Sequence, residues 1–439
     1  MKYYIYGKGV NGEGIVSFLG LYFPNQSYAF IDDSKEESSL INLLAHIQQE
    51  DRILIASTLH YEKIEENLTQ YHLENYENGI IWCGEILNQK LKDYKESHCF
   101  KKYIGLVVCK WTEKHFVDLE SQLKALGYGV IYFTFYSEIY KKYAKKNFCL
   151  FAPHAVLERV VEVEMMLLTN LTPTNEKVIS IDITHGFQGS LVYPFMKFSL
   201  TDKAFLKYSY STANYIVCGS KKIHRAYEEF FQSIQEKPTL LDTGYLKLDK
   251  DVQEFEKFCK KQQVAGIKSQ NDIVIFAFTF FDEIARMIVL MKECFRLNLR
   301  VFFKPHPVYA EKLMPKILEA FAGEKLFIEE MESKELFYHS LCVVTDCSSM
   351  GYTYPLTTAK PSLILGDNKQ EIDKSEKYYE EKLMVSCSKD EDFREFLQEI
   401  IATQESYPVK VKIYRQNECF NFANATKSLV EQIELILGD

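Results

Sequence analysis

Short apolar runs alternate with stretches of helical periodicity along most of the chain. The first part begins with an apolar run at 3–6, turns through glycines and continues as a predicted helix at 13–19. Further helices are predicted at 116–126 and 423–437. Strands are predicted at 27–31, 52–57, 79–83, 104–109, 130–135, 178–183, 215–218, 273–278, 300–303, 342–345 and 362–365. Strands that alternate with helices indicate an α/β fold with parallel sheets and helices on their faces.

The alternation restarts twice, which divides the chain into three predicted segments. A polar run at 90–102 reads as a linker, so the first segment is placed at 1–98. The other two segments are placed at 99–235 and 236–439. A chain of 439 residues is too long for one ordinary domain. The strands carry unbroken apolar runs, which suits sheets that are buried on both faces.

Composition narrows the class of protein. Hydrophobic residues make up 47% of the chain and charged residues 26%, a globular balance. The net charge of -9 argues against a dedicated nucleic-acid binder, which would show a basic stripe. The 11 cysteines form no CxxC pair, so we interpret most of them as buried thiols in a reducing compartment.

The sequence predicts a cytoplasmic location. Its first residues do not resemble a signal peptide, because the apolar run is short and leads straight into a glycine turn. No window approaches the roughly 20 apolar residues that cross a bilayer. The basic residues Lys221, Lys222, His224 and Arg225 leave open a peripheral contact with anionic lipid at the inner face of the cytoplasmic membrane.

A glycine pattern lies between the first predicted strand and helix. Gly7, Gly9 and Gly12 have the GxGxxG spacing, and Asp32 follows Gly12 by twenty residues. In dinucleotide-binding folds the glycines let a phosphate approach the backbone, and the acid binds a ribose hydroxyl. The pattern alone is compatible with a nicotinamide or flavin, with a small nucleotide or sugar nucleotide, or with a Rossmann-like module that only packs.

Chemistry-bearing residues follow two predicted strands of the third segment. Lys304 and His306 follow the strand at 300–303, in a loop stiffened by two prolines. Asp346, Ser348 and Ser349 follow the strand at 342–345 and precede a helix start, where unpaired N–H groups and the helix dipole favour an anion. Simple helix capping explains one such residue, but it explains the pairing with the Lys-Pro-His-Pro loop less well.

An ordered set of motifs across 178–366 resembles the CDP-glycerol glycerophosphotransferases, the GT-B enzymes that make teichoic acid backbones. His185 and Gly186, after the strand at 178–183, resemble the family's Trp-His-Gly. Val217-Cys218-Gly219-Ser220 resembles a short strand that runs into a serine, and residues 244–249 resemble the loop Gly-Tyr-Pro-Arg-Asn-Asp. Residues 276–279 resemble the strand that leads into Ala-Pro-Thr-Trp-Arg, and residues 304–307 resemble Lys-x-His-Pro. Residues 346–349 resemble Asp-Tyr-Ser-Ser, and Lys360-Pro361 resembles a Lys-Pro pair downstream of it.

The resemblance implies a GT-B fold, in which two Rossmann-like domains face a cleft, with the first segment as an extra Rossmann-like module. It implies that the donor diphosphate lies on the helix start after Asp346, with Lys304, His306, Ser348 and Ser349 neutralising the leaving nucleotide. His185 would be the general base. Gly186, Lys247, Thr279 and Lys360 are further site candidates by position in the motifs.

The same resemblance implies neither metal nor cofactor. The expected partners are a nucleotide donor linked to CDP, UDP or CMP and a polymer or lipid-linked glycan acceptor. Several positions depart from the family: Thr184 replaces the tryptophan, Leu246, Lys247 and Leu248 replace Pro-Arg-Asn, and phenylalanines surround Thr279. These departures leave open a nucleotide-sugar donor, as in capsule or lipopolysaccharide assembly, or a non-catalytic nucleotide-binding scaffold.

Overall fold

The structure is a computed structural model that describes most of the chain. The described residues are 1–57, 59–109, 112–169, 172–184, 186–187, 213–232, 237–266, 271–278, 284–305, 310–322, 326–328, 334–346, 348–365, 380, 383–387 and 390–438. They form three sheets, and every strand pair whose register is described is parallel. The α/β class predicted from the alternation is therefore confirmed.

The N-terminal sheet has the strand order β2-β1-β3-β4. Its strand β1 alternates between two cores: Tyr3 and Ile5 pack with α1 and α4, whereas Tyr4 and Tyr6 pack with α3. This two-sided burial explains the unbroken apolar run in the sequence. The elements are β1 Lys2–Tyr6, α1 Val10–Tyr22, β2 Ser27–Ile31, α2 Leu40–Leu43, β3 Arg52–Ile55, α3 Tyr61–Gln70, β4 Tyr76–Asn78 and α4 Gly79–Ser97.

Helix α4 corrects two predictions. The apolar run at 79–83 is not a strand but the first turns of this helix, because the Asn78 side chain caps it by accepting from the N–H groups of Ile80 and Ile81 at 3.0 and 3.2 Å. The helix then continues to Ser97, so most of the predicted linker at 90–102 is helical. Leu87 and Leu91 bury its inner face.

The middle sheet has the order β11-β10-β9-β8-β5-β6-β7. One hydrophobic cluster joins α4 of the N-terminal part to Val156 and Leu157 and to strands of this sheet. Separate folding of 1–98 stays a prediction. The elements are β5 Tyr103–Val107, α5 Val117–Ala125, β6 Gly129–Thr134, α6 Ser137–Tyr143, β7 Cys149–Phe151, β8 Met165–Leu168, β9 Ile179–Asp182, β10 Tyr215–Val217, α9 Lys221–Phe231 and β11 Thr239–Leu241.

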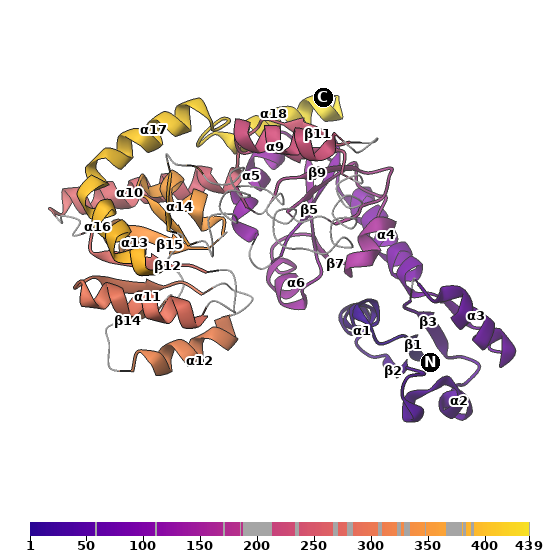
Figure 1. The fold of residues 1–439 in the computed structure, drawn as a ribbon. Helices are drawn as coiled ribbons and strands as arrows, with labels where there is room; N and C mark the ends of the chain where they lie inside the picture. Colours follow the sequence, from indigo (N-terminus) through magenta and orange to yellow (C-terminus); the bar gives the residue numbers. More distant parts are fainter. Residues whose placement is uncertain are drawn as a thin grey trace. The chain divides into compact units, whose positions relative to one another are not determined.

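The third sheet has the order β14-β13-β12-β15-β16-β17. Helices cover both faces: α11 and α12 lie on one side and α14 on the other (Figure 1). The elements are α10 Leu246–Val264, β12 Ile273–Phe276, α11 Ile284–Arg296, β13 Arg300–Phe303, α12 Ala310–Ala320, β14 Leu326–Ile328, α13 Lys334–His339, β15 Ser340–Thr345, α14 Met350–Thr358, β16 Ser362–Leu365, β17 Met384–Cys387, α16 Phe393–Thr403, α17 Tyr407–Asn417 and α18 Ala425–Leu437.

The chain divides into two compact units. The first contains Met1–Ile183, and the second contains Leu240–Asp439. The second unit also takes Thr184, Gly186, Phe187 and the described residues 217–232. Within the described residues, no helix is both long enough and apolar enough to cross a bilayer.

Candidate functional site

The third sheet changes direction between β12 and β15. From β12 the chain adds β13 and β14 on one side, and then it returns to add β15, β16 and β17 on the other. In open parallel sheets, ligands bind outside the carboxyl ends of the strands at such a switch point. The residues that follow β12 and β15 are therefore the first place to look for a ligand site.

Lys304 and Asp346 leave the sheet at this same edge. Phe276, the last residue of β12, pairs with Phe303 on one side and with Val344 on the other. Lys304 donates its backbone N–H to the Phe276 carbonyl at 2.8 Å. Since adjacent strands lie about 4.8 Å apart, Lys304 and the residues after β15 flank the end of β12 at a separation of roughly 10 Å. A lysine side chain and a helix start can reach a common phosphate over that distance.

The turn after β15 uses some of its own polar groups. Asp346 Oδ1 accepts from the Ser348 N–H at 3.1 Å, and Ser348 Oγ accepts from the Met350 N–H at 3.3 Å. Ser349 is the N-cap residue of α14, but its side chain makes no capping hydrogen bond. Asp346 is buried, and its carboxylate would repel a phosphate. Asp346 and Ser348 thus shape the turn, and the Ser349 hydroxyl stays available to a ligand.

Three of the predicted site residues lie outside the described residues: the two expected catalytic residues, His185 and His306, and the site candidate Thr279. The structure does describe the flanks of His185. Thr184 has φ 54°, a left-handed conformation that is unusual for a β-branched residue, and its Oγ1 donates to the Gly186 carbonyl at 3.2 Å. Strained backbone of this kind is concentrated at functional sites.

Phe187 ties the segment after His185 to the helix that begins beside Ser349. Its side chain is fully buried and stacks on Tyr352 of α14, with ring centroids 5.3 Å apart. It also meets the Tyr245 ring edge-on at 5.9 Å. The sequence does not reveal the part of Phe187, because its partner lies far along the chain. An aromatic residue directly after His-Gly is the only local signal.

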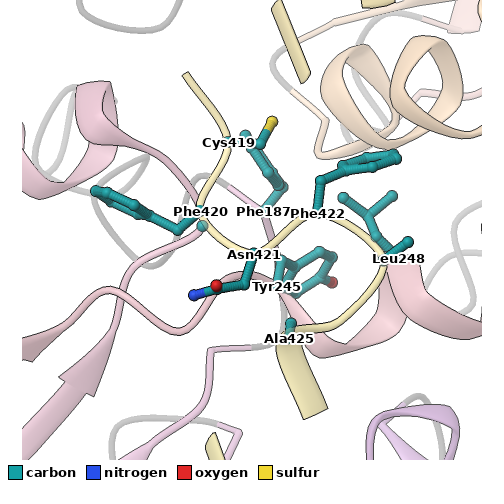
Figure 2. A pocket seen from close by; sticks show the side chains of 10 residues that line it. Phe187, Tyr245, Leu248, Cys419, Phe420, Asn421, Phe422 and Ala425 are labelled. Carbon is teal, nitrogen blue, oxygen red and sulfur yellow. The ribbon is translucent and has the colours of Figure 1, made fainter. Parts of the chain in front are cut away.

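Three motifs of the resemblance meet around a tight hollow in the second unit. Figure 2 shows Phe187, Tyr245 and Leu248 around the segment that carries Phe420 and Phe422. Gly219 also lines it, and a Cβ there would lie 3.1 Å from the Phe187 ring. The hollow leaves no room for a water-sized molecule, so it is packing that holds the motifs together and not a ligand pocket.

The motif at 244–249 proves to be structural in most of its positions. Gly244 has φ 93°, and a Cβ there would lie 2.4 Å from the Phe420 carbonyl oxygen. Asp249 caps α18, because its carboxylate accepts from the N–H groups of Ala425 and Thr426 at 3.0 and 2.7 Å. Lys247 pairs with Asp251 one turn later on α10.

Lys360 lies at the opposite edge of the third sheet, away from the turn after β15, and a part for it in ligand binding stays a prediction. Its Nζ donates to the carbonyls of Tyr338 and Ser340 at 2.7 and 2.5 Å and to Asn271 Oδ1 at 2.9 Å. Ser340 begins β15, so the lysine is roughly 16 Å from the end of that strand. Burial lowers the pKa of Lys360 to about 8. Its hydrogen bonds connect the loops at the amino edge of the sheet.

The glycine turn of the N-terminal sheet forms as the spacing predicts. Gly7 has φ 105° and donates its N–H to the Ile31 carbonyl at 2.9 Å, which brings it beside Asp32. Gly12 allows α1 to approach the turn, since a Cβ there would lie 2.0 Å from the Gly7 carbonyl oxygen. Gly9 is the N-cap of α1, while Asp32 Oδ1 accepts from the Ser34 hydroxyl at 2.6 Å. A ligand at this turn stays a prediction.

Comparison with known proteins gives the family. The family model described as CDP-Glycerol:Poly(glycerophosphate) glycerophosphotransferase matches residues 190–435. No curated protein sequence matches the chain.

Solved structures show a shared fold. A variant of the wall teichoic acid polymerase TagF with CDPG is 15% identical, with a TM-score of 0.57, and the match covers 88% of this chain and 98% of that chain. TagF without a named variant is also 15% identical, with a TM-score of 0.53 and coverages of 85% and 96%. This likeness supports the GT-B type of α/β fold. The family match spans more than half of the sequence, so the chain belongs to the CDP-glycerol:poly(glycerophosphate) glycerophosphotransferase family and is a transferase of that kind.

Proposed function

We propose that this chain transfers glycerol phosphate from CDP-glycerol to the end of a teichoic-acid-like polymer, with the donor diphosphate at the carboxyl end of β15. The family description names this donor and a poly(glycerophosphate) acceptor. The observation that carries the site assignment is the stacking of Phe187 on Tyr352. This contact anchors the segment next to His185 on the helix that starts after Ser349, so a base and an anion site belong to one unit.

The proposed reaction is a displacement at phosphorus. An acceptor hydroxyl attacks the phosphorus that carries glycerol, the phosphoanhydride bond breaks, and CMP leaves. His185 takes the proton of the attacking hydroxyl, a role that suits a side chain with an ordinary pKa near 6.5. Lys304, His306 and the Ser349 hydroxyl stabilise the negative charge that develops on the departing phosphate, with Asp346 and Ser348 shaping the turn.

The test is a transfer assay with a lipid-linked glycerol phosphate primer and labelled donors. We expect transfer from CDP-glycerol and release of CMP, and we expect His185→Ala and His306→Ala each to lower turnover by about 10²- to 10⁴-fold. His98→Ala is a matched control, because His98 is exposed at the end of α4. Near-normal turnover in both site variants would remove these histidines from the mechanism. Transfer from a UDP-linked sugar instead of CDP-glycerol would favour the nucleotide-sugar alternative.

A further inference from the structure

A second cluster of reactive side chains lies at the start of α9, outside the proposed donor site. Cys218, His224 and Asp242 each offer one ligand atom, and these atoms all lie within 4.8 Å of one another. We propose that this cluster binds a divalent transition metal of the zinc class. The proposal does not depend on the transfer reaction, because neither His185 nor the turn after β15 contributes to it.

The backbone around the cluster is held in place by hydrogen bonds. Cys218 follows β10 and donates its N–H to the Leu241 carbonyl at 2.8 Å, which places it beside Asp242 at the end of β11. Ser220 caps α9 by accepting from the Ile223 N–H at 3.3 Å, and this cap sets the first turn that carries His224. Asn421 Nδ2 donates to the Asp242 carbonyl at 2.8 Å. Three ligand positions are therefore fixed before any metal arrives.

The ligand types match the chemistry of zinc. A thiolate, an imidazole and a carboxylate are the three side chains that bind Zn²⁺ in proteins. His224 Nδ1 lies 2.6 Å from Asp242 Oδ1, and tetrahedral coordination would separate these atoms to roughly 3.4 Å. The Asp242 side chain is 46% exposed, so it can make this small movement. Because the cluster supplies three ligands, the fourth coordination position of a bound ion would be open to water.

The other ring nitrogen of His224 supports the same assignment. Nε2 lies 3.5 Å from Glu228 Oε1, one turn later on α9. A metal-bound histidine almost always donates its second ring N–H to a carboxylate, carbonyl or water, which orients the ring. Two carboxylates around one imidazole also give the cluster excess negative charge, which a divalent cation would neutralise. The bound ion would connect the ends of β10 and β11 with the first turn of α9.

Two basic residues beside the cluster, Lys222 and Arg225, have acidic partners. Lys222 pairs with Glu380 at 3.9 Å, and Arg225 pairs with Glu418 at 3.8 Å. These ion pairs reduce the positive charge around His224 that would otherwise oppose a cation.

The experiment titrates the full chain, freed of metal by a chelator, with Co²⁺ and with Zn²⁺. We expect a single equivalent of Co²⁺ to give the near-ultraviolet absorption of a cobalt–thiolate bond, and Zn²⁺ to raise the melting temperature. Cys218→Ser should abolish the absorption band, and Glu228→Gln should weaken binding by about 10- to 100-fold. Cys259→Ser is the matched control, because Cys259 is a partly exposed thiol on α10 outside the cluster.

Two outcomes would overturn the proposal: no cobalt–thiolate band in the wild type, or a band that survives Cys218→Ser. If Cys218→Ser does not fold, Asp242→Asn replaces it, because that side chain is exposed and its loss should leave folding intact. Unchanged Co²⁺ affinity in Asp242→Asn and in Glu228→Gln would then refute the site.

Discussion

Replacing Ser348 and Ser349 one at a time should separate turn formation from donor binding. Ser348 Oγ accepts from the Met350 N–H, so Ser348→Ala removes a helix cap and should lower the free energy of unfolding by about 1 kcal/mol. Ser349 makes no such bond with its side chain. Its carbonyl accepts the Tyr352 and Thr353 N–H groups, and alanine preserves both bonds. Ser349→Ala should therefore change stability by less than about 0.5 kcal/mol.

The effect of Ser349→Ala on the donor should be much larger. A hydrogen bond from a hydroxyl to a charged phosphate contributes about 1.5–3 kcal/mol, which corresponds to a roughly 10- to 100-fold weaker Kd for CDP-glycerol. Calorimetric titration measures the affinity, and urea unfolding measures the stability of the same samples.

Thr353→Val is a matched control on the same helix. It removes a hydroxyl that donates to the Ser349 carbonyl at 3.1 Å, so it should cost stability but leave donor affinity unchanged. Wild-type donor affinity in Ser349→Ala, or equal loss of affinity in Thr353→Val, would refute the assignment of the phosphate site to this turn.

Three further predictions concern residues that the structure assigns to packing or capping. Phe187→Ala should destabilise by about 3–5 kcal/mol, and Phe187→Leu should retain the fold but lower kcat more than it raises KM, if the aromatic stack positions His185. Asp249→Ala should lower the free energy of unfolding by about 1–2 kcal/mol in a urea titration without changing donor affinity, because it removes both hydrogen bonds that cap the N-terminus of α18. The pKa of Lys360 is lowered to about 8, so the folded state binds fewer protons than the unfolded state between about pH 8 and 10. The stability of the wild type relative to Lys360→Met should therefore rise by up to about 3 kcal/mol as pH rises through that window, and a flat difference would contradict this reading.

The sequence alone located most of the longer strands of the three sheets, because these are unbroken apolar runs. It did not predict six shorter strands that the structure describes, namely β4, β7, β8, β11, β14 and β17. The prediction of a strand at 79–83 was wrong for a local reason. A short apolar run does not distinguish a strand from a buried helix start, and the deciding group was the Asn78 side chain one residue earlier. The ends of β13 and β15 lie where the sequence predicted them, so Lys304 and Ser349 could be assigned to one edge of the sheet before its strand order was known.

Only the tertiary structure decided which of the motif residues act together. Lys360 matches a Lys-Pro motif of the family in sequence, yet its acceptors come from Asn271 and from the carbonyls of α13 and β15 at the far edge. Asp249 looked like part of a ligand motif, but its partners are the first N–H groups of α18. Phe187 had no visible partner until the fold brought Tyr352 against it. Periodicity reports whether a residue is buried, whereas the identity of its neighbour depends on how distant segments are packed, and local sequence does not encode that packing.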